Sequence, residues 1–72
     1  MELNLSGKRI RIARREKGLS QEQIAARLQL NGLNTSQGVV SQIECGLRTV
    51  SDYELKAIAK VLNKPVEWFL EE

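Results

Sequence analysis

The chain has 72 residues, of which 42% are hydrophobic, and a net charge of only +2, so we expect one folded domain over residues 1–72 and not a disordered tail. Its single cysteine excludes an internal disulfide, and the absence of histidine excludes histidine-based catalysis. No apolar run is long enough to span a bilayer and the start shows no signal-peptide pattern, so we expect a soluble, cytoplasmic protein with no membrane association.

The N-terminal part of the chain is strongly basic. Between residues 8 and 17, Glu16 alone opposes the cations Lys8, Arg9, Arg11, Arg14, Arg15 and Lys17. The C-terminal end carries the carboxylates of Glu67, Glu71 and Glu72. This asymmetry is typical of a protein with one face toward a polyanion, although a solvated helix face explains the same cations.

Capping and turn signals predict two helices in the first part of the chain. The first begins at a cap on Asn4 or Ser6 and ends at about Lys17, before Gly18. The second covers residues 19–28 and begins with a capping box made by Ser20 and Gln23. The segment 29–35 interrupts the helical pattern, since it contains Asn31, Gly32, Asn34 and Thr35.

The third predicted helix has an unusual outward face. Ser36 caps it, Gly46 ends it, and Val40 and Ile43 form its apolar stripe. Its opposite face is small and amide-bearing, with Gln37, Gly38, Ser41 and Gln42 in place of the usual Glu, Lys and Arg. Glutamine pairs with adenine edges in the major groove, and Ser and Gly let the backbone come close. We therefore interpret this helix, at about residues 37–45, as a recognition helix.

Two further helices complete an all-α fold of five helices without strands. Ser51 and Glu54 form a second capping box that opens a helix to about Leu62, and Pro65 begins a short helix over residues 66–70. Helices two and three have the helix-turn-helix arrangement, but with a turn longer than usual.

The motifs together resemble the Cro/C1-type helix-turn-helix family, which includes phage repressors and bacterial regulators of the xenobiotic-response-element type. The resemblance covers roughly residues 7–70 and lies in the runs LSQEQIA from Leu19, VSQIECG from Val40, LKAIAKVL from Leu55 and VEWFL from Val66. It implies a compact five-helix bundle of the lambda-repressor-like type, here with an elongated turn between helices two and three.

The resemblance also implies roles for single residues. Gln21 would contact a DNA phosphate at a helix N-terminus, where the backbone favours an anion. Gln37 and Gln42 would read base edges, with Gly38 and Ser41 facing the same groove, and Arg14 and Glu44 would form a pair joining the first helix to the third. Apart from the resemblance, further phosphate contacts are expected from Ser36, Arg48, Arg11 and Asn34 by their positions, although simple solvation also explains the two arginines.

Two features depart from the family pattern. The longer segment before Ser36 either extends the second helix or forms a loop. Such a loop either contacts the phosphate backbone through Asn31 and Asn34 or is a passive surface loop. Cys45 stands where the family commonly has Asn, and a thiol is a poor phosphate donor.

The last helix is the expected dimer contact. Trp68, Phe69 and Leu70 cannot easily all point inward from one terminal turn, although such residues are more often core. One recognition helix reads few base pairs, and two copies related by a two-fold axis double the readout.

The favoured function is sequence-specific double-stranded DNA binding by a transcriptional regulator that acts as a homodimer. The alternative is a helical protein–protein adaptor, such as an antitoxin-like or polymerase-binding protein, and RNA polymerase is a second candidate partner. We expect no enzyme activity, cofactor, metal or small-molecule ligand, since the chain has no carboxylate pair, phosphate-binding loop or metal-ligand cluster.

Overall fold

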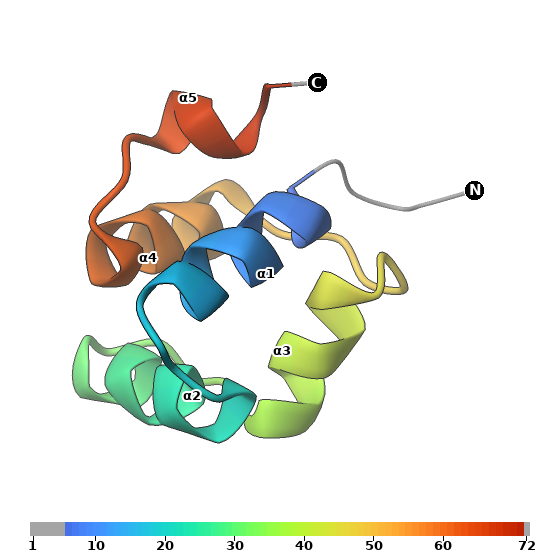
Figure 1. The fold of residues 1–72 in the computed structure, drawn as a ribbon. Coiled ribbons are helices and arrows are strands. Elements are labelled where there is room, and N and C mark those ends of the chain that lie inside the picture. The colour runs from blue at the N-terminus through green and yellow to red at the C-terminus, as the bar shows by residue number, and fades with distance from the viewer. Residues whose placement is uncertain (1–5, 72) are drawn as a thin grey trace.

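The computed structural model describes residues 6–71 and consists, over that span, of five helices connected by short loops. They are α1 (Gly7–Glu16), α2 (Gln21–Leu30), α3 (Gln37–Glu44), α4 (Asp52–Leu62) and α5 (Val66–Phe69). Figure 1 shows α3 on one side of the bundle, beside α1 and the N-terminal end of α2, while α4 lies behind α1 and α5 covers both. The predicted all-α fold of five helices is confirmed over the described residues.

The helix starts follow the local capping signals. Both predicted capping boxes are present, Ser20 with Gln23 and Ser51 with Glu54. The Ser36 hydroxyl accepts a hydrogen bond from the Val39 N–H at 3.3 Å and so caps α3. Ser6 occupies the N-cap position of α1, but its side chain makes no capping hydrogen bond, so this helix start departs from the prediction. The other candidate cap, Asn4, lies outside the described residues.

Helix α2 ends two residues later than predicted. It continues to Leu30, because Gln29 and Leu30 both favour helix. The apolar pattern did not predict this extension, because Leu30 is 86% exposed and lies off the apolar stripe of the helix. The end itself is a Schellman motif: Leu33 N–H donates to the Leu28 carbonyl, and Gly32 has a φ of 88° that glycine adopts without a Cβ clash.

The connection between α2 and α3 is packed against the protein. Leu33 is buried, and the Gln29 side-chain amide donates to the Thr35 carbonyl at 2.7 Å. The elongated turn predicted from the sequence is therefore partly a longer α2 and partly an anchored loop over residues 31–36. This arrangement fixes where α3 begins.

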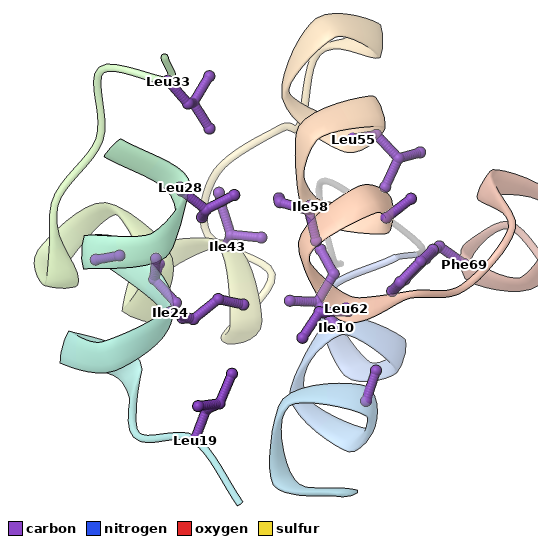
Figure 2. Close-up of a cluster of buried hydrophobic side chains, with 14 residues drawn as sticks. Ile10, Leu19, Ile24, Leu28, Leu33, Ile43, Leu55, Ile58, Leu62 and Phe69 are labelled. Atoms are coloured by element: carbon purple, nitrogen blue, oxygen red, sulfur yellow. The ribbon is translucent and has the colours of Figure 1, made fainter. Parts of the chain in front are cut away.

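The core draws on every helix. Figure 2 shows side chains from all five elements converging, and the largest of those that are completely buried are Phe69, Ile10, Ile24, Leu28 and Leu62. Each such side chain contributes roughly 1.5–3 kcal/mol through burial. Helix α3 adds Val40 and Ile43 and packs on both α1 and α2, so it is held from two sides.

None of the helices in the described part of the chain combines the length and apolar character that crossing a membrane requires.

Candidate nucleic-acid interface

The polar face of α3 points away from the core. Gln37, Gly38 and Gln42 are exposed and Ser41 is half-buried, whereas Val40 and Ile43 on the other side are buried. A Cβ added at Gly38 would meet only the Ser36 hydroxyl, at an ordinary contact distance of 3.8 Å. The protein itself therefore leaves room for a side chain at this position, and packing does not require glycine there.

A buried ion pair attaches the C-terminal end of α3 to α1. Arg14 Nε and Nη2 donate to the two carboxylate oxygens of Glu44 at 2.6 and 2.9 Å, and Nη1 donates to the Leu19 carbonyl at 2.8 Å. The side chains are only 9% and 2% exposed. The hydrogen bonds from Arg14 to Glu44 raise the pKa of the guanidinium although burial opposes them, so Arg14 stays cationic throughout the physiological range.

The same carboxylate is the start of a hydrogen-bonded relay that reaches the surface. Gln21 Nε2 donates to Glu44 Oε1 at 3.1 Å, and Gln37 Nε2 donates to Gln21 Oε1 at 2.7 Å. We call these residues, Arg14, Glu44, Gln21 and Gln37, the α1–α3 relay. It connects the interior of α1 to the first residue of the exposed face of α3.

The relay brings together residues that the sequence analysis assigned to separate roles. The pair of Arg14 with Glu44 was implied by the family resemblance, whereas the contact between Gln21 and Gln37 was not predicted. One signal was present in the sequence: both glutamines follow a capping serine, as Ser20-Gln21 and Ser36-Gln37, so both occupy the first position of a helix. Backbone N–H groups at these two helix starts have no partner within the helix and favour an anion.

Ser36 and Asn34 lie beside the start of α3. Asn34 is exposed, and the Ser36 hydroxyl, which accepts the capping bond, keeps its own hydrogen available for donation. On the other side of α3, exposed Arg11 lines a hollow of about 520 Å³ together with Lys8, Ile12, Arg15 and Glu44. The hollow thus places three cations of α1 next to the buried ion pair.

Arg48 is bound to the start of α4. Its Nη1 donates to Glu54 Oε2 at 3.0 Å and to the Thr49 carbonyl at 3.3 Å. Burial alone would raise the pKa of Glu54, but hydrogen bonds from Ser51 and Arg48 and the attraction of Arg48 lower it below its ordinary value. Cys45, the C-cap of α3, is a free and exposed thiol.

The three large residues of the last helix have different environments. Trp68 is half-buried between two cations, with the Arg9 guanidinium 4.8 Å and the Lys64 ammonium 4.5 Å from its ring centroid. Leu70 is exposed. Phe69 is completely buried, so its assignment to a dimer surface was wrong: the terminal turn directs it into the core, where it packs edge-on against Trp68.

A family model described as helix-turn-helix matches residues 10–69, a span that begins inside α1 and ends with α5. No curated protein and no solved structure gives a significant match to the chain. The matched span contains the whole α1–α3 relay and the complete exposed face of α3.

Proposed function

Because this chain belongs to the Cro/C1-type helix-turn-helix family, whose members are DNA-binding regulators, we propose that it regulates transcription as a homodimer that reads the major groove with α3. The observation that carries the proposal is the outward face of α3, which is polar, small and fixed at its first residue by the α1–α3 relay. A helix built in this way presents amides at defined positions on a rigid support.

Gln37 and Gln42 read the bases. A glutamine amide donates and accepts at once, which matches the N7 acceptor and N6 donor of adenine. Gly38 and Ser41 lie between them on the same face and let the helix backbone approach the base edges. Since Gln37 is already bonded to Gln21, its amide enters the groove with its orientation set.

Phosphate contacts surround this reading face. Gln21 and Ser36 offer helix N-termini, Asn34 lies beside the start of α3, and Arg11 lies on α1. Arg48 reaches a phosphate only by sharing or releasing its ion pair with Glu54.

Dimerisation supplies the specificity that one helix lacks. Each mismatched base pair costs roughly 1–3 kcal/mol, so one short recognition helix discriminates weakly against a genome. We place the contact between protomers at α5, where Trp68 and Leu70 reach the surface. Half-sites about one helical turn apart would then face two copies of α3.

Selection from a random duplex library tests the proposal. The purified chain is incubated with the library at near-physiological salt, and bound duplexes are sequenced. We expect a two-fold symmetric motif, and we expect Gln37→Ala and Gln42→Ala each to relax the preference at its own position by roughly 1–3 kcal/mol. Lys56→Ala, on α4, is the control and leaves the motif unchanged.

If no motif is enriched and only weak binding is seen that vanishes as salt rises, the chain does not recognise a DNA sequence and binds DNA only as a polyanion. A motif that survives both glutamine substitutions would mean that another element reads the bases.

A further inference from the structure

A second surface, formed by the C-terminal end of α2 and the outer side of α4, is apolar at its centre and basic at its edge. Its apolar residues are Leu30, Tyr53 and Val61, and its cations are Arg27, Lys56 and Lys60. We call this surface the α2/α4 face. Two shallow hollows, of about 170 and 260 Å³, meet on it at Asn31.

Two of the three apolar side chains at the centre of this face are largely exposed. Leu30 is 86% exposed and Tyr53 67% exposed. Scattered apolar residues on a surface need no explanation, but here both line adjoining hollows on one face. Neither belongs to the buried core cluster, which includes Leu28 of α2 and Leu55 of α4.

The charge of the face is unbalanced. Within the described part of the chain, Arg27, Lys56 and Lys60 take no part in an ion pair, whereas Arg48 and Lys64 each have a carboxylate partner. No Asp or Glu is among the described residues that line the two hollows. The face therefore presents positive potential around an apolar centre, which favours a ligand with the opposite charge and large apolar groups.

We propose that the α2/α4 face docks a short acidic amphipathic segment of a partner protein. The apolar side chains of that segment cover Leu30 and Tyr53, and its carboxylates pair with the cations at the edge. A nucleic acid fits less well, because its backbone would be placed over an apolar centre. Figure 1 shows the C-terminal end of α2 on the side of the molecule opposite α3, so a docked segment leaves the reading face of α3 open.

Peptide selection with the full chain tests this inference independently of DNA binding. Random dodecapeptides are displayed and selected on the folded protein, and enriched peptides are synthesised with a fluorescent label for titration. We expect sequences that combine Asp or Glu with large apolar residues and bind with a Kd in the range of about 1–100 μM, as small interfaces do. Their affinity should fall as salt increases.

Two variants and two matched controls locate the binding site. Leu30→Ser should weaken binding about tenfold or more, and the double variant Lys56→Gln/Lys60→Gln should weaken it and reduce its salt dependence. Leu47→Ser changes another leucine that is 70% exposed, and Arg15→Gln/Lys17→Gln removes two cations from the end of α1. Both controls should bind the peptides as the wild type does, and helical circular dichroism verifies the fold of every variant.

Each contrary result has a definite meaning. The inference is wrong if no peptide is enriched, if enriched peptides lack acidic residues, or if they bind the Leu30→Ser variant unchanged. It is also wrong if random-sequence duplex DNA displaces them, because the face would then bind nucleic acid. Self-association that Leu30→Ser abolishes would identify a second copy of the chain as the occupant and overturn the assignment to a partner protein.

Discussion

The ion pair between Arg14 and Glu44 provides the most direct test of how α3 is held on α1. Glu44→Gln preserves the shape of the side chain but leaves the Arg14 guanidinium, whose side chain is 9% exposed, without its counter-charge. Breaking a buried pair from one side costs roughly 3–5 kcal/mol. Arg14 keeps its hydrogen bond to the Leu19 carbonyl, which favours the lower end of that range, about 3 kcal/mol.

This loss is large for a domain of 72 residues. A single core of this size rarely supplies more than about 3–5 kcal/mol. The variant should therefore keep at most about 2 kcal/mol of its free energy of unfolding, with a melting temperature lower by roughly 12–24 °C. Arg14→Met should behave similarly, since it leaves the buried Glu44 carboxylate with Gln21 as its remaining side-chain donor.

A double-mutant cycle separates the pair from the packing around it. The corners of the cycle are wild type, Arg14→Met, Glu44→Met and the double variant Arg14→Met/Glu44→Met. Replacing both partners by methionine removes the two charges together, so the double variant should recover most of the stability, to within about 1–2 kcal/mol of wild type. Urea denaturation followed by circular dichroism gives the four free energies of unfolding. The folded double variant should still bind its selected duplex more weakly, because Gln21 has lost its acceptor on Glu44.

A different result would be that each single variant lowers the free energy of unfolding by less than about 1 kcal/mol and the double variant lowers it by the sum of the two. The pair would then behave like an ion pair on the surface, and α3 would be held by its apolar contacts alone.

Four other changes test separate parts of the structure. Gly38→Ala should keep or raise the free energy of unfolding, by up to about 1 kcal/mol, yet weaken binding to the selected duplex. Equal affinity of the variant and wild type in titrations would contradict a close approach of the backbone to the groove at this residue. Trp68→Ala should shift the monomer–dimer equilibrium toward monomer in sedimentation and thereby weaken DNA binding, whereas an unchanged equilibrium in a folded variant would exclude Trp68 from the interface. The lowered pKa of Glu54 means that its carboxylate stabilises the fold fully above the unfolded value of about pH 4.3 and that this stability is lost as the pH falls through the lower folded value. Glu54→Gln should therefore have a lower melting temperature than wild type at neutral pH, and this difference should disappear in acid. A difference in melting temperature that does not depend on pH would contradict a stabilising role of the Glu54 carboxylate. Asn63, the C-cap of α4, has a φ of 58°, and Asn63→Gly should raise the free energy of unfolding by about 1 kcal/mol in urea denaturation; a loss would show that its side chain matters more than its backbone.

Helix starts and the fold class were predictable because their signals are local. A capping box such as Ser20 with Gln23 lies within four consecutive residues, and its hydrogen bonds form wherever the helix begins. The apolar stripe of α4 likewise follows from helical spacing alone. The end of α2 was harder, because exposed Leu30 continues the helix without continuing the apolar pattern.

Features that depend on contacts between helices were not predictable from the residues themselves. Phe69 and Leu70 are adjacent and similar in character, and only the path of the chain after Pro65 decides which of them is buried. The pair of Arg14 with Glu44 was implied by a family resemblance and not by any spacing in the sequence. Two further hydrogen bonds, from Gln21 to Glu44 and from Gln37 to Gln21, could be predicted only with the crossing of α2 and α3 known.

The two glutamines that we propose to read bases differ in how readily their specificity can change. Gln37 is held by Gln21 before any duplex arrives, so the entropy of ordering this side chain, roughly 0.5–1.5 kcal/mol, is not lost again on binding. A residue without a side-chain donor at that position loses this advantage and leaves Gln21 Oε1 without its hydrogen bond from Gln37. Gln42 has no side-chain hydrogen bond to another described residue, so its replacement disturbs nothing but the base contact. Divergence of the recognised sequence within such a fold should therefore begin at the base pair under Gln42.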